Sequence, residues 1–157
     1  MDPVNVPADT MAVAGRLALA TLLGAALGVN REISLKPAGL RTHALVSLGA
    51  ALITLVGLQL GQSAGDTAAP GRIIQGLVAG IGFIGGGVIL HRRDAKVVHG
   101  LTTAASIWIA SGTGVAVATG LWRAALTAVI LSLIVLTLGR PLDDALHKIA
   151  DGDRDEN

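Results

Sequence analysis

Residues 73–90 read IIQGLVAGIGFIGGGVIL, a run without a charged side chain and close to the roughly 20 apolar residues that cross a bilayer. Further apolar stretches lie on either side of it, and short charged clusters separate them. The predicted spans are residues 11–29, 45–60, 73–90, 101–119 and 124–138. Apolar residues lie on all sides of these segments, which indicates burial in lipid and protein. The sequence therefore predicts an all-α integral membrane protein, a bundle of five transmembrane helices.

The composition also indicates a membrane protein and excludes several other classes. Apolar residues make up 52% of the 157-residue chain, charged residues make up 15%, and the mean hydropathy is +0.65. Soluble domains average about 25% charged residues. The lack of cysteine excludes disulfides and cysteine metal sites, and a net charge of +1 gives no basic excess for nucleic acid. We find no nucleophile–base–acid set and no Walker motif, so we predict neither an enzyme nor a cofactor.

The lysine and arginine residues of the loops predict the orientation. Nine of the 12 follow the first, third and fifth spans, whereas the other side holds Arg16, Arg72 and Arg123. Because cytoplasmic loops are enriched in these residues, we expect the N-terminus outside and the C-terminus in the cytoplasm. The alternative is a cleaved signal peptide over residues 1–29, but its beginning should be basic, and two aspartates precede its first arginine.

This topology divides the chain into three parts. Residues 1–10 are an external N-terminal segment, and residues 11–139 are the transmembrane domain. Residues 140–157 are predicted to form a short cytoplasmic amphipathic helix and an acidic tail. Pro141 suits the first turn of that helix, and the apolar residues after it fall on one face.

Glycines recur at intervals of four in the first and third spans. The set is Gly24, Gly28, Gly76, Gly80, Gly82 and Gly86. Such smooth faces let helix backbones touch in lipid, where no hydrophobic force drives association. We favour packing inside one subunit over a homodimer seam. Residues 80–85 also match GxGxxG, but no strand precedes them and no acidic residue follows about 20 positions on, so we reject a dinucleotide site.

The triplet Gly85, Gly86 and Gly87 calls for a separate explanation. Each glycine costs about 1 kcal/mol relative to alanine inside a helix. We therefore hypothesise that the third span loosens or breaks near its cytoplasmic end. Freed carbonyls would then line a polar cavity, as in transporters with broken helices. A tightly crowded helix crossing is the alternative.

The first cytoplasmic loop gathers the polar residues of a candidate ion site. They are Asn30, Arg31, Glu32, Arg41, Thr42 and His43. Because charges at membrane boundaries usually pair, we favour an ion pair of Glu32 with Arg41 or Arg31. The alternative is a hard cation such as Mg²⁺, held by oxygen atoms of Asn30, Glu32 and Thr42.

Basic and hydroxyl residues surround the start of the fourth span. The group comprises His91, Arg92, Arg93, Lys96, His99, Thr102, Thr103 and Ser106. The arginines and the lysine enforce topology and meet anionic lipid head groups, and we interpret the histidines as solvated rather than as metal ligands. The threonines can cap the fourth helix, or their hydroxyls, like that of Ser106, can face a neighbouring helix.

Four stretches together resemble the MgtC/SapB family of bacterial inner-membrane proteins. They are LLGAALGVNRE (22–32), KPAGLRTHALVSLGAAL (36–52), GIGFIGGGVIL (80–90) and GLTTAASIW (100–108). The resemblance covers about residues 15–138. It implies a multi-pass protein of the bacterial inner membrane with a role linked to magnesium limitation and, in intracellular pathogens, to survival in host cells. It also implies action on other membrane proteins, ATP synthase among them.

This chain departs from the family pattern in two places. Asn30 stands where the family commonly has an acidic residue. Longer members continue into an ACT-like domain after the fifth span, and we do not expect regulation through such a domain here. We expect a non-enzymatic regulator in magnesium homeostasis that acts by helix contact with a membrane-protein partner or a second copy. One alternative is a channel or carrier for Mg²⁺ or another cation, with Glu32, Arg41 and the predicted helix break near its path. Another is a membrane scaffold without a magnesium link.

Overall fold

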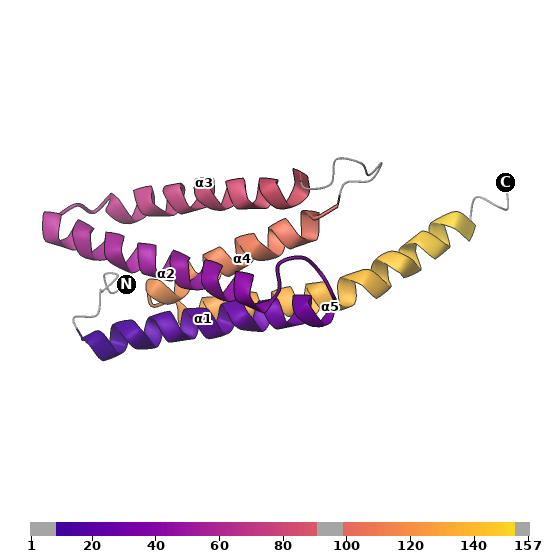
Figure 1. Ribbon diagram of the computed structural model, residues 1–157, viewed down its shortest axis with the longest axis horizontal. Coiled ribbons are helices and arrows are strands. Elements are labelled where there is room, and N and C mark those ends of the chain that lie inside the picture. The colour runs from indigo at the N-terminus through magenta and orange to yellow at the C-terminus, as the bar shows by residue number, and fades with distance from the viewer. Residues whose placement is uncertain (1–8, 91–98, 153–157) are drawn as a thin grey trace.

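The computed structural model describes residues 9–90 and 99–152, which form five helices (Figure 1). They are α1 (Thr10–Ile33), α2 (Leu40–Ala64), α3 (Ala69–Leu90), α4 (Leu101–Ala118) and α5 (Trp122–Gly152). Each helix contains a segment long and apolar enough to cross a membrane. The described residues contain no strand. The predicted all-α bundle of five transmembrane helices is confirmed.

Helices α1 and α2 continue past the predicted spans into polar sequence. Helix α1 runs to Ile33 rather than to residue 29, and α2 begins at Leu40 rather than at residue 45. The predicted boundaries followed hydropathy, whereas a helix continues as long as its backbone hydrogen bonds and its terminal groups are satisfied. Consequently Arg31 and His43 belong to helices and not to a loop.

Helix α5 is longer than its predicted span. The structure continues it from Trp122 through Pro141 to Gly152, instead of starting a separate helix at Pro141. Figure 1 shows this last part extending beyond the bundle. Proline removes one backbone donor, the one that would bond the carbonyl of Thr137, but the helical bonds on either side remain. The predicted acidic tail after residue 152 lies outside the described residues.

Helix α4 is the centre of the bundle. It packs against all four other helices, whereas α3 contacts α2 and α4. The buried core is built mostly from small and aliphatic side chains: Ala20, Leu27, Ala51, Leu55, Ile107, Ala110, Val117, Ala118, Ala125 and Val129. Small side chains let helix axes approach closely, which is the main source of attraction between helices in lipid.

Glycines lie in the closest helix crossings. A Cβ atom at Gly24 would lie 2.5 Å from the His43 carbonyl oxygen, and one at Gly28 would lie 2.5 Å from an α2 backbone atom. The predicted packing of these two glycines inside one subunit is therefore confirmed. A Cβ at Gly114 of α4 would lie 2.1 Å from the Ser47 carbonyl oxygen, a crossing that the sequence analysis overlooked.

The same prediction is wrong for the glycines of α3. For six of its seven glycines a Cβ would meet nothing within 4 Å in the described part of the chain: Gly71, Gly76, Gly80, Gly82, Gly86 and Gly87. Helix α3 instead contacts its neighbours through other residues. Ile73 fills the space at Gly57 of α2, and a Cβ at Gly85 would meet Ala104 of α4 at 3.5 Å. Most of the glycine face is therefore turned away from the bundle.

Helix α3 is continuous through its glycine triplet. Ala69–Leu90 is a single α-helix, so the break predicted at Gly85, Gly86 and Gly87 is wrong. Three glycines cost about 3 kcal/mol in intrinsic helix propensity. In hydrocarbon each backbone group without a hydrogen bond costs several kcal/mol, so keeping the helix intact is the cheaper solution.

The described helices start and finish at opposite ends of the bundle (Figure 1). The end where α1 and α3 finish and α2 and α4 begin carries Arg31 and Arg41, and α5 extends past it. The fold itself does not encode which membrane side this end faces. Its cytoplasmic placement remains a prediction from the distribution of basic residues.

Candidate functional site at the junction of α1, α2 and α4

The turn that ends α1 determines the geometry of one end of the bundle. The Lys36 N–H bonds to the Arg31 carbonyl, and the Leu35 N–H bonds to the Glu32 carbonyl, both at 3.0 Å. This is the Schellman pattern, in which the chain turns through a left-handed residue. Leu35 holds that position with φ 51°, where glycine is usual. The tight turn keeps Arg31, Glu32 and Lys36 close to the start of α2.

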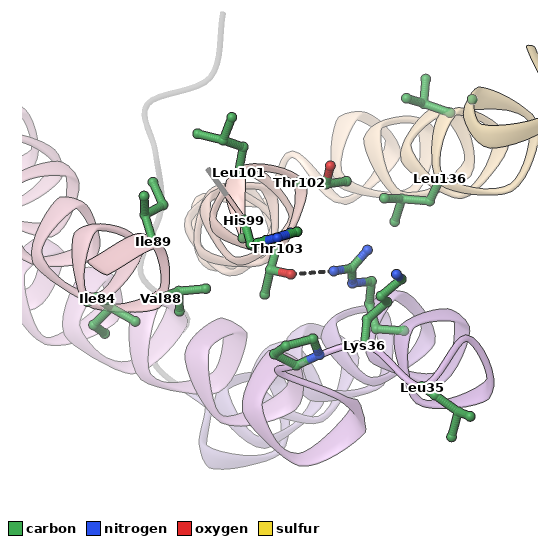
Figure 2. A pocket seen from close by; sticks show the side chains of 16 residues that line it. Leu35, Lys36, Ile84, Val88, Ile89, His99, Leu101, Thr102, Thr103 and Leu136 are labelled. Atoms are coloured by element: carbon green, nitrogen blue, oxygen red, sulfur yellow. Dashed lines mark hydrogen bonds between the residues drawn. The ribbon is translucent and has the colours of Figure 1, made fainter. Parts of the chain in front are cut away.

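Arg31 lies inside the bundle. Its side chain is 4% exposed, and its Nη2 donates a hydrogen bond to Thr103 Oγ1 in the first turn of α4. Figure 2 marks this bond with a dashed line. A buried guanidinium is costly unless its surroundings supply hydrogen-bond partners. Helices α1 and α4 are therefore joined by a buried cation, which makes this junction unlike the rest of the apolar core.

Hydrogen bonds continue from Thr103 to α2. The Ser106 hydroxyl lies 2.8 Å from the Thr103 carbonyl oxygen and 3.0 Å from His43 Nε2. His43 Nδ1 donates to the Gly39 carbonyl at 3.0 Å, since a carbonyl oxygen accepts only. Thr103, Ser106 and His43 are all buried. The prediction that the Thr103 and Ser106 hydroxyls face neighbouring helices is confirmed.

Glu32 has a different partner from the predicted arginines. Its Oε2 accepts a hydrogen bond of 3.1 Å from the Leu40 N–H in the first turn of α2. Within the residues that the structure describes, no salt bridge joins Glu32 to Arg31 or Arg41, so the predicted ion pair is wrong. The turn places the carboxylate at the N-terminus of α2, where unpaired N–H groups and the positive end of the helix dipole attract it.

The residues predicted to bind magnesium through oxygen atoms make separate contacts. Asn30 Nδ2 donates to Thr137 Oγ1 of α5 at 3.2 Å, whereas Glu32 caps α2. Thr42 is half-buried and Arg41 is exposed. Across residues 9–90 and 99–152, no group of three histidine, aspartate or glutamate residues could hold a metal ion. From the predicted set, the structure links Arg31 and His43 through α4 and leaves Asn30 and Glu32 on separate contacts.

A cavity of about 1100 Å³ opens beside Arg31. Its polar lining is Arg31, Lys36, His99, Thr102 and Thr103. Its apolar lining includes Leu35, Ile84, Val88, Ile89, Leu101, Val135 and Leu136. Figure 2 shows Lys36 and His99 on either side of the bond between Arg31 and Thr103. The described lining contains no carboxylate, so the site presents positive charge and hydrogen-bond donors.

The cap of α4 differs from the predicted one. Gly100 is the N-cap, with φ 93°, and its carbonyl accepts the Ala104 N–H at 2.8 Å. Thr102 and Thr103 therefore lie inside the first turn, and the predicted threonine cap is wrong. Glycine suits the position because its left-handed φ is strained for other residues. The Thr103 hydroxyl is thereby used by Arg31 instead of by its own helix.

Part of the predicted basic group cannot be placed relative to this site. His91, Arg92, Arg93 and Lys96 lie outside the described residues. His99, by contrast, is described and lines the cavity.

The sequence analysis missed the polar face of α2. His43, Ser47 and Thr54 recur at intervals of four and seven, which puts them on one helix face, and all three are buried. Ser47 donates to the Ala20 carbonyl of α1 at 2.7 Å. The helical spacing of these polar residues was the signal from which this face could have been predicted.

A scan against family models matches the MgtC family over residues 17–145. The chain belongs to the MgtC family. The MgtC-family resemblance predicted from four sequence stretches is therefore confirmed, and the chain is a multi-pass membrane protein with five candidate spans.

Three similar proteins align with most of this chain. Protein SrpB of Synechococcus elongatus is 40% identical over 140 residues, which cover 82% of this chain and 75% of SrpB. Protein MgtC of Salmonella typhimurium is 39% identical over 133 residues, covering 85% of this chain and 54% of that protein. An uncharacterized protein of Haemophilus influenzae is 31% identical over 145 residues, covering 89% and 60%. No solved structure matches the chain.

Proposed function

We propose that this chain is a non-enzymatic membrane protein of magnesium homeostasis that works by helix contact with a membrane-protein partner. Membership of the MgtC family suggests the connection with magnesium. The contact is our inference from one observation, the uncovered glycine face of α3. The match covers 54% of Salmonella MgtC. A role of that whole protein is therefore carried over to this chain only as a proposal.

The α3 face has the features of a helix-packing surface. Gly76, Gly80 and Gly87 share one face with Phe83, at helical spacings of four, seven and eleven. Phe83 is 86% exposed, and α3 is the least buried of the five spans. Helices in lipid associate through faces of small residues that let backbones approach. In this chain α1 uses such a face against α2, whereas the α3 face is left for another protein.

The positive cavity supports this proposal over a cation channel or carrier. The described polar lining carries Arg31 and Lys36, and such charges favour anions over cations in a pore. Glu32, the carboxylate predicted near a cation path, caps α2. The centre of the bundle is packed with alanine, leucine and valine side chains from several helices.

The test is growth in low magnesium of a bacterium that lacks its own MgtC-family protein. Gly80→Leu should fold as the parent does, because its Cβ has open space, yet it should fail to restore growth. Gly15→Leu is the matched control, since Gly15 of α1 is also exposed with open space at its Cβ, and it should restore growth. A photo-crosslinker at position 80, but not at position 15, should capture a partner membrane protein.

Three results would contradict the proposal. Full growth with Gly80→Leu at normal protein levels would show that the α3 face is not used. Magnesium flux into sealed liposomes that carry the purified protein, above that of empty liposomes, would favour a carrier instead. Normal growth of the deletion strain in low magnesium would favour a scaffold without a magnesium link.

A further inference from the structure

The cavity beside Arg31 results from the way α4 separates two helices. Helices α3 and α5 both pack against α4, but in the described part of the chain they do not contact each other. The space between them is bounded by Ile84 and Val88 of α3 and by Val135 and Leu136 of α5. The first turn of α4 and the end of α1 close it on the polar side. The cavity therefore joins a polar end to apolar walls of membrane-spanning helices.

The polar end of the cavity is built to receive an anion. Arg31 and Lys36 carry two positive charges, His99 offers a ring nitrogen, and Thr102 and Thr103 carry hydroxyls. The N-terminal end of α4 adds partial positive charge at the same place. The charge of Lys36 and the partial charge of α4 both attract an anion to this end of the cavity.

We propose that this cavity binds a phosphate-bearing anion, with the phosphate between Lys36, His99 and the first turn of α4. Guanidinium and ammonium groups bind phosphate oxygens through charge-assisted hydrogen bonds, which are the strongest type in proteins. A volume of about 1100 Å³ is large enough for a phosphate and a further organic portion. The apolar side chains of α3 and α5 would contact that portion.

The position of the cavity favours a lipid as the source of the phosphate. The apolar walls belong to two spans that leave a gap between them, so an acyl chain can lie there while the head group reaches Lys36. A free phosphate compound would use the polar end alone. This site meets one end of the contact face proposed for α3: Gly87 lines the cavity, whereas Gly76 and Gly80 do not.

The probe is purified protein in detergent, offered phosphatidylglycerol or phosphatidylcholine, with retained lipid counted by native mass spectrometry. The protein should retain phosphatidylglycerol in preference to phosphatidylcholine. Lys36→Gln combined with His99→Gln should weaken retention by about tenfold, as expected for the loss of two contacts to phosphate. Both residues are exposed, so these substitutions leave the core intact. Arg123→Gln, an exposed cation at the other end of the bundle, is the charge control.

A second variant tests the cavity by volume. Gly87 lines the cavity and has open space at its Cβ, so Gly87→Leu should fold normally and place a side chain where the lipid would lie. Gly80→Leu, two helical turns away on the same helix, should retain lipid as the parent does. For growth, the proposed partner contact predicts failure of Gly80→Leu and full growth of the Lys36 and His99 double variant, so failure of one proposal is distinguishable from failure of the other.

A competition experiment identifies the source of the phosphate. A lipid site is supported if millimolar inorganic phosphate does not displace phosphatidylglycerol from the parent protein, and if the Lys36 and His99 substitutions release it. Binding of inorganic phosphate that depends on the same two residues, without a preference among lipids, supports a soluble phosphate compound. Equal retention of both lipids with no binding of phosphate, or retention unchanged in both Gly87→Leu and the double variant, would overturn the proposal.

Discussion

Gly114→Ala is expected to destabilise the bundle by about 2 kcal/mol. The new Cβ would lie 2.1 Å from the Ser47 carbonyl oxygen and 3.0 Å from the Ala51 backbone nitrogen. Ordinary contact starts at 3.4 Å, so α2 and α4 must separate by more than an ångström. Overpacking costs about 1–3 kcal/mol, and backbone atoms give way less than side chains, which puts this case at the upper end. Alanine regains about 1 kcal/mol in helix propensity.

The measurement is unfolding in mixed micelles of rising sodium dodecyl sulfate content, followed by far-ultraviolet circular dichroism. Gly112→Ala is the matched control on the same helix, because Gly112 is exposed and its Cβ meets nothing within 4 Å of the described residues. We expect it to be as stable as the parent or more stable by up to about 1 kcal/mol. If Gly114→Ala is as stable as Gly112→Ala, close contact between α2 and α4 does not determine stability.

Three further changes test the polar end of the bundle and one loop. Ser106→Ala should cost about 1–3 kcal/mol because it leaves the buried His43 Nε2 without this hydroxyl, whereas Ser132→Ala, which loses a bond within its own helix, should be nearly neutral in the same unfolding titration. Glu32→Ala should cost about 1 kcal/mol through loss of the α2 cap; Glu32→Gln keeps an oxygen acceptor and should cost less, and equal losses would contradict a capping role. Asp66, in the loop between α2 and α3, accepts hydrogen bonds from the Arg72 guanidinium and the Ala68 N–H, which lower the pKa of Asp66 below 3.8. These bonds therefore stabilise the fold above that pH and are lost as pH falls through the lowered value. Asp66→Asn should therefore be less stable than the parent at neutral pH and equal to it in strong acid, by a small amount that salt reduces. A difference between the two proteins that is independent of pH would contradict this assignment.

The five helices were predictable because hydrocarbon imposes a simple requirement. Every backbone group in a span must bond within its own helix, so a long apolar run has essentially one solution. The continuous α3 helix follows from the same rule, which outweighs the weak helix propensity of Gly85, Gly86 and Gly87. The prediction of a break gave the local propensity too much weight.

The candidate site was predicted in part. Most of its polar residues were named from the sequence, although Lys36 was not, and the interhelical positions of the Thr103 and Ser106 hydroxyls were foreseen. The partners were not, because the bond between Arg31 and Thr103 joins residues 72 positions apart, and the one between His43 and Ser106 joins residues 63 apart. Such pairs depend on how α1, α2 and α4 cross. The preference for an ion pair at Glu32 failed for a local reason, since the turn after α1 places this carboxylate on the α2 backbone.

The sequence by itself determined that this is a membrane protein of five helices and that it resembles the MgtC family, because hydropathy and the family stretches are local properties of the chain. The tertiary structure alone decided which glycines are packed. Gly24 and Gly80 stand in similar GxxxG patterns, yet a Cβ at Gly24 would collide with α2, and one at Gly80 meets nothing within 4 Å in the described residues. The physical reason is that lipid and protein are both apolar, so a small-residue face packs equally well against this chain or against another, and only the arrangement of the helices selects between them.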